Sequence, residues 1–144
     1  VQTSLNMGTL AMKEDGVHFS YSVRSCLASQ KKDLLRRVSA IVTSGGGTVE
    51  INGDYPGWQF RKESAFRDVI LQSYKNVTSE DGRIEATHGG LECGLFIEKI
   101  PGLDAVSMGP ELHDVHSAKE RLSVASTQRT YEVVCEALKN SCTQ

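Results

Sequence analysis

The clearest pattern in the chain is an alternation of apolar and polar residues near its start. Residues 17–24 read Val-His-Phe-Ser-Tyr-Ser-Val-Arg, which predicts a strand with a buried apolar face and an open polar face. Residues 3–12 also carry regularly spaced apolar positions, and Asp15-Gly16 between the two stretches is typical of a hairpin turn. The chain is therefore expected to open with a β-hairpin.

Helical spacing follows this hairpin. From about Ser29, apolar residues recur three or four positions apart, with lysine and arginine between them, until three consecutive glycines at 45–47. This pattern predicts a helix, and residues 48–52 predict a third strand. Residues 1–53 are thus expected to form a small antiparallel sheet with a helix on one face.

A turn-rich stretch at residues 52–58 marks an expected boundary. Beyond it the spacing predicts helices at about 64–76, shortly after Gly89-Gly90 to about 97, and at 123–141, with short strands at 83–87 and 105–108. This alternation favours an α/β layer with parallel strands over residues 54–144. The fold class expected for the whole chain is α/β, or α+β overall, with the antiparallel part first.

Composition and charge exclude several classes of protein. The 144 residues are 39% hydrophobic and 24% charged, as in ordinary folded domains, and the net charge is −2. With this charge the chain has no overall basic field that would attract nucleic acid. The basic pairs at 31–32 and 36–37 are expected on the solvent-exposed face of their helix. No apolar run approaches the roughly 20 residues that a membrane-spanning helix needs. We therefore expect neither a nucleic-acid nor a membrane partner.

The cysteines and the first residue bear on the cellular setting. The four cysteines follow no metal or redox spacing, so reduced thiols in a cytoplasmic protein are expected, with two disulfides in a secreted protein as the alternative. The chain opens without Met, directly in strand-like sequence. We expect it to be a piece of a longer chain.

Three places carry candidate chemistry. His113 and His116 lie in a loop after an expected strand, where they could chelate a metal together or simply be solvated. Residues 88–94, His-Gly-Gly-Leu-Glu-Cys-Gly, open a helix, where free N–H groups favour an anion, although a tight turn explains the glycines equally. Arg24 ends the polar stripe of its strand and could be a carboxylate fork or a solvated cation.

Two further residues in the 88–94 stretch stay open. Glu92 could be a ligand or a base, or an acid that complements the helix dipole. Cys93 could be a nucleophile, but no base is identifiable beside it, which favours a buried structural thiol.

Four ordered stretches resemble the C-terminal part of the aminoacyl-histidine dipeptidases (Xaa-His dipeptidase, peptidase D), members of a zinc exopeptidase superfamily. They are Tyr-Pro-Gly-Trp at 55–58, His-Gly-Gly-Leu-Glu-Cys-Gly-Leu-Phe at 88–96, the stretch 100–110 and His-Ser-Ala-Lys-Glu-Arg-Leu at 116–122. The resemblance covers essentially the whole chain. It implies that residues 1–53 end an inserted lid domain, which often mediates dimerisation, and that 54–144 end the catalytic domain.

The resemblance also implies roles for individual residues. His116 matches the C-terminal zinc ligand, although Ala118 stands where the family usually has proline. Arg24 matches the lid arginine that binds the substrate carboxylate. The turn whose backbone meets the same carboxylate corresponds to Gly89, Gly90 and Leu91, with glycine in place of the family's usual alanine at the first position. His113 has no counterpart, and His88 belongs to the motif without an assigned role.

The implied activity is hydrolysis of Xaa-His dipeptides, such as β-alanyl-histidine (carnosine), by a cytoplasmic enzyme with two zinc ions per subunit that dimerises through its lid. The other metal ligands and the general-base glutamate belong to the family's N-terminal part, so this chain alone is expected to be inactive. An aminoacylase-like or tripeptidase-like specificity on the same scaffold is one alternative. A non-catalytic binding or dimerisation module derived from the lid is another.

Overall fold

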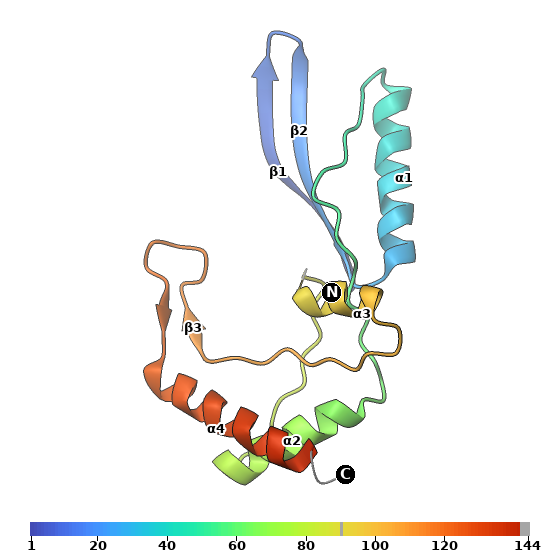
Figure 1. Cartoon of the computed structure of the whole chain (residues 1–144). Coiled ribbons are helices and arrows are strands. Elements are labelled where there is room, and N and C mark those ends of the chain that lie inside the picture. The colour runs from blue at the N-terminus through green and yellow to red at the C-terminus, as the bar shows by residue number, and fades with distance from the viewer. Residues whose placement is uncertain (90, 142–144) are drawn as a thin grey trace. The chain divides into compact units, whose positions relative to one another are not determined.

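The computed structural model describes residues 1–89 and 91–141. Four helices and two antiparallel two-stranded sheets make up this part of the chain (Figure 1), which confirms the mixed α+β class. The chain divides into two compact units, one of Val1–Phe60 with Ala86–Leu103 and one of Arg61–Glu85 with Asp104–Gln144. The assignment of 1–53 to a lid and 54–144 to a catalytic domain stays a prediction.

The first unit opens with the predicted hairpin of β1 (Thr3–Lys13) and β2 (Gly16–Ser25). The ladder shifts register between Met7 and Thr9, so Gly8 forms a bulge. The bulge explains why apolar residues in β1 fall at 5 and 7 but then at 10 and 12, because one extra residue returns the later pair to the same face. Sorting both strands by this register gives one apolar and one polar face.

The apolar face of the hairpin is not buried, contrary to the sequence prediction. Phe19 is 53% exposed and Tyr21 42% exposed, although their rings stack with centroids 6.3 Å apart. Within the described part of the chain, α1 (Ala28–Ser44) is the helix that packs along β2. One helix beside a two-stranded ribbon covers too little area to bury a full row of side chains.

Helix α1 confirms the predicted helix at its start and its end. The Leu27 N–H donates to the Ser25 hydroxyl before the helix, and Gly46 with φ 80° follows its last turn. Lys31 was expected on the wet face, but its side chain is only 13% exposed. Its ammonium binds the Asp54 carboxylate and the Tyr55 carbonyl, which ties the connector after residue 53 to the helix.

The second unit is built on two helices, α2 (Ala65–Thr78) and α4 (Val124–Ser141). They pack on each other through small residues, with Ser73, Val133 and Ala137 at 0%, 1% and 4% exposure. The Asn140 amide donates to the Ser73 hydroxyl at 3.0 Å, so the polar atom in this contact is satisfied. Both helices lie where the sequence predicts them.

A carboxylate caps α2 from a distant part of the same unit. Asp104 accepts hydrogen bonds from the Ser64 hydroxyl at 2.8 Å and from the Phe66 N–H at 3.1 Å, and Arg61 lies 3.6 Å from it. Burial opposes ionisation of this carboxyl, but these bonds and the neighbouring arginine charges hold the pKa of Asp104 below its ordinary value. Asp104 thus satisfies the Phe66 N–H, one of the N–H groups that the first turn of the helix leaves open.

The prediction of a layer of parallel strands over residues 54–144 is wrong for the described part of the chain. Residues 48–52, 83–87 and 105–108 form no ladder in the described part of the chain, and both of its sheets, β1–β2 and the pair of β3 (Leu112–His113) and β4 (Arg121–Leu122), are antiparallel. A strand exists only through hydrogen bonds to a neighbouring strand. Ile51 and Ile84 are 54% and 52% exposed, so the described part of the chain leaves about half of each residue uncovered.

Candidate functional site

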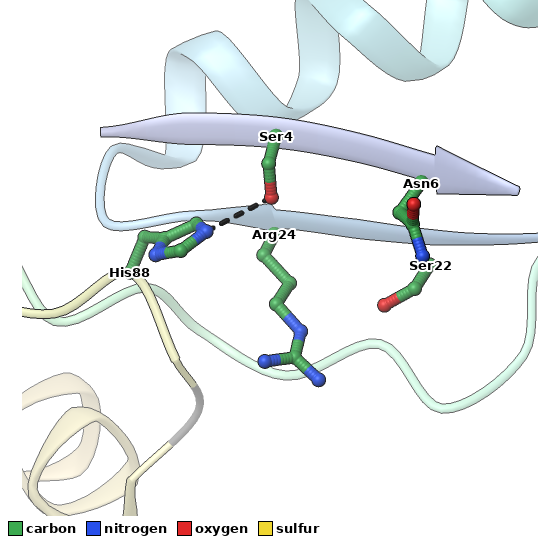
Figure 2. Close-up of a pocket in the computed structure, with 5 residues that line it drawn as sticks. All are labelled: Ser4, Asn6, Ser22, Arg24 and His88. Atoms are coloured by element: carbon green, nitrogen blue, oxygen red, sulfur yellow. Dashed lines mark hydrogen bonds between the residues drawn. The ribbon is translucent and has the colours of Figure 1, made fainter. Parts of the chain in front are cut away.

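The polar face of the β1–β2 hairpin forms one wall of a pocket in the first unit. Its lining residues come from both strands and from the segment before α3 (Glu92–Lys99), and they are Ser4, Asn6, Ser22, Arg24 and His88 (Figure 2). The ladder pairs Ser4 with Arg24 and Asn6 with Ser22. Because paired residues point to the same face of a sheet, these four side chains are forced to that side together.

Arg24 is the charged group of this pocket. Among the described residues no carboxylate lies in ion-pair distance of its guanidinium, and no acidic residue lines the pocket. Figure 2 shows the side chain extending from β2 on the side of the His88 ring. An unpaired guanidinium on a rigid strand, surrounded by hydroxyl and amide groups, is suited to an incoming carboxylate.

The segment that leads into the glycine turn lies beside this arginine, because His88 lines the same pocket. The His88 Nε2 and the Ser4 hydroxyl are 2.9 Å apart, and the Gly89 N–H donates to the Thr87 hydroxyl at 3.1 Å. The N–H of Gly89 is therefore already engaged, and a ligand there would compete with Thr87. Gly90 lies outside the described residues. Carboxylate contacts at Gly89, Gly90 and Leu91 stay predictions.

Two other glycines bring α3 close to the end of β2. A Cβ on Gly57 would lie 2.6 Å from the Ser25 carbonyl oxygen, and one on Gly94 would lie 3.1 Å from the Pro56 carbonyl oxygen. The connector around Pro56 therefore runs directly between the strand end and α3. This close packing explains why positions 57 and 94 carry glycine, and it sets α3 against the connector that touches the end of β2.

His116, the predicted metal ligand, lies in the second unit between β3 and β4. Asp114 and His116 have φ values of 52° and 64°, in the left-handed region that non-glycine residues rarely adopt. The His116 N–H donates to a Glu120 carboxylate oxygen at 3.0 Å, and Arg121 pairs with Asp114 at 3.0 Å. These contacts hold the strained turn in one conformation.

The imidazole of His116 is suited to bind a metal but does not make a site alone. The residue is exposed, and its ring makes no hydrogen bond within residues 1–89 and 91–141. In that same part of the chain no three His, Cys, Asp or Glu residues are grouped to hold an ion. The donor chemistry therefore fits one ligand of a site whose other ligands come from elsewhere. Joint chelation with His113 stays untested.

Sequence reasoning missed the roles of Ser4, Asn6 and Glu120. The sequence signal for Ser4 and Asn6 is the register of the two strands. Deducing that register requires recognising the bulge at Gly8 from the three-residue step between the apolar residues Met7 and Leu10. The signal for Glu120 was its spacing, four residues after His116. The β3–β4 hairpin around it was expected as a plain loop.

No protein-family model matches the chain. It is 32% identical over 139 residues to the cytosol non-specific dipeptidase of Escherichia coli K12, covering 96% of this chain and 29% of that protein. The crystal structure of aminoacylhistidine dipeptidase from Vibrio alginolyticus superposes with a TM-score of 0.79 at 30% identity, covering 98% of this chain and 29% of that one.

These two similarities show that the chain resembles one portion of larger proteins of the dipeptidase class. The resemblance to aminoacyl-histidine dipeptidases inferred from the motifs is confirmed. The chain spans under a third of the length of both proteins. None of the described helices is long and apolar enough to cross a membrane.

Proposed function

We propose that this chain is the C-terminal part of a cytoplasmic di-zinc dipeptidase that hydrolyses Xaa-His dipeptides such as β-alanyl-histidine. The observation that carries the proposal is that, among the described residues, the Arg24 guanidinium has no ion-pair partner and its pocket has no acidic lining residue. A dipeptidase must recognise the free carboxylate at the end of its substrate. A fixed guanidinium can bind both carboxylate oxygens at once, which also orients the peptide bond.

The other site residues have supporting roles in this proposal. The turn at Gly89 and Leu91 faces the bound carboxylate, and the His116 ring supplies one metal ligand. Zinc, when bound, polarises the scissile carbonyl and activates water. The remaining ligands and the general base come from outside this chain, so the chain alone is inactive. Two copies of the protein associate through residues 1–53.

The requirement for a free carboxylate gives the direct test. The full-length protein is assayed with β-alanyl-L-histidine and with the same compound carrying a C-terminal amide. The proposal expects kcat/KM to fall by about 10- to 100-fold for the amide, since a charge-assisted bidentate contact is lost. Equal rates for acid and amide would remove Arg24 from substrate recognition.

A broader specificity is the second candidate, because the Escherichia coli relative is named a non-specific dipeptidase. A panel of β-alanyl-histidine, glycyl-histidine, alanyl-alanine, a tripeptide and an N-acetyl amino acid separates the possibilities. Preference for the two histidine dipeptides supports the proposal, similar rates for all dipeptides support the second candidate, and cleavage of the last two compounds indicates tripeptidase or aminoacylase specificity. No turnover of any of them would favour a binding or dimerisation module.

A further inference from the structure

We propose that His88 is a positioning residue, which through its bond to Ser4 holds Gly89, the residue after it, beside Arg24. The inference rests on the proposed function of the pocket and goes beyond it by giving His88 a role. It starts from one contact within the first unit, the 2.9 Å approach of His88 Nε2 to the Ser4 hydroxyl, drawn as a dashed line in Figure 2.

The hydrogen-bond partner of His88, Ser4, determines where the ring and the backbone after it lie. Ser4 lies directly opposite Arg24 in the β1–β2 ladder, and opposed side chains on one face of a sheet are nearest neighbours. A ring bonded to Ser4 is therefore fixed next to the rung that carries the guanidinium. The Gly89 backbone, which follows the ring directly, is therefore held near the same rung.

The segment before α3, which His88 anchors, depends on a side-chain contact of this kind. Residues 61–85 belong to the second unit, and the chain re-enters the first unit at Ala86. The contact of Gly94 with the connector holds α3 itself, but it lies six residues further along. Among the described residues between Ala86 and Gly94, His88 makes the side-chain hydrogen bond to the hairpin, while Thr87 closes the local turn.

The chemistry of the bond limits which residues can replace histidine. The ring nitrogen Nε2 either donates to or accepts from the serine hydroxyl, depending on the tautomer. A glutamine side chain reaches a similar distance and offers both a donor and an acceptor. Alanine offers neither, so His88→Gln is the conservative variant and His88→Ala the disruptive one.

The experiment compares His88→Ala, His88→Gln, Ser4→Ala and the double variant with Ala at both positions in the full-length protein. His18→Ala and Ser20→Ala are matched controls, because these residues lie on the same polar face away from the pocket. KM and kcat are measured with β-alanyl-L-histidine. Calorimetry compares binding of L-histidine and L-histidinamide, which gives a readout that does not depend on turnover.

The proposal expects His88→Ala to raise KM, and the Kd for L-histidine, by roughly three- to tenfold with kcat nearly unchanged. His88→Gln should return both values to within about twofold of the wild type. Ser4→Ala should match His88→Ala, and the double variant should be no weaker than either single one, since both remove the same bond. The two controls should behave as the wild type.

Three results would overturn the inference. One is an unchanged Kd in His88→Ala, and another is additivity of the two alanine changes. The third is a His88→Gln variant that has the thermal stability of the wild type but does not regain wild-type binding of L-histidine. If Arg24→Ala weakens L-histidine binding while His88→Ala does not, only this inference fails. If the wild type binds L-histidine no better than L-histidinamide, the proposed function of the pocket fails as well.

Discussion

Arg24 and Ser4 are directly opposed across the β1–β2 ladder, so the guanidinium of the pocket shares a rung with the hydroxyl that binds His88. A strand fixes the backbone of Arg24, while no described carboxylate competes for its guanidinium. The strand thus fixes where the Arg24 side chain begins, and its exposed guanidinium is open to an external anion.

Arg24→Ala should raise KM for β-alanyl-histidine by about 10- to 100-fold, because the bidentate contact to the carboxylate is lost. Arg24→Lys should recover only part of this, since an ammonium supplies the charge without the planar fork. Steady-state kinetics of the full-length protein measure both effects. Arg36→Ala, on the exposed side of α1, is the matched control, and an unchanged KM in Arg24→Ala would contradict the assignment.

His116→Ala should reduce the zinc content of the full-length protein and abolish most of its activity, because one ligand of the metal site is removed. His113→Ala is the control, three residues away in β3, and should leave both unchanged. Metal analysis after dialysis gives the first readout and the initial rate the second. Wild-type zinc content in His116→Ala would show that this histidine is not a ligand.

Glu120→Ala should weaken metal binding without removing it. The carboxylate of Glu120 holds the His116 N–H at 3.0 Å and so stabilises a left-handed residue that otherwise costs about 1–3 kcal/mol. Glu120→Gln keeps an acceptor oxygen and should lie between Ala and the wild type. Competition with a chelator measures the zinc Kd. Equal zinc affinities in the wild type, Glu120→Ala and Glu120→Gln would show that the bond from Glu120 to the His116 N–H does not support metal binding.

Asp104→Ala should lower the free energy of unfolding by about 0.5–2 kcal/mol at pH 7, since it removes the capping carboxylate of α2. The folded-state pKa of Asp104 is below its ordinary value of 3.8, so its contribution is complete above that value. It declines as the pH falls through the lowered pKa. Urea unfolding at pH 7 and pH 3 should therefore show the difference from the wild type shrinking in acid.

The hairpin and all four helices could be predicted because their signals are local. Alternation, helical spacing and Gly45 to Gly47 fix these elements from neighbouring residues alone. The strands expected at 48–52, 83–87 and 105–108 could not, because a strand depends on a partner, and periodicity does not reveal whether the chain contains one.

The candidate site was predictable only as far as the motifs reach. Arg24 and His116 stand in stretches that resemble the family, so their types and positions pointed to a role. Ser4 and His88 meet through a contact 84 residues apart in sequence. Only the three-dimensional register brings such a pair together, which is why the role of His88 stayed open at the level of sequence.

The most direct test of the account is the zinc content and β-alanyl-histidine hydrolysis of the full-length protein, with the 144-residue chain as the control. The account predicts close to two zinc ions per subunit and turnover in the full-length protein, with neither in the shorter chain. A metal-free, inactive full-length protein would contradict it, and so would turnover by the 144-residue chain.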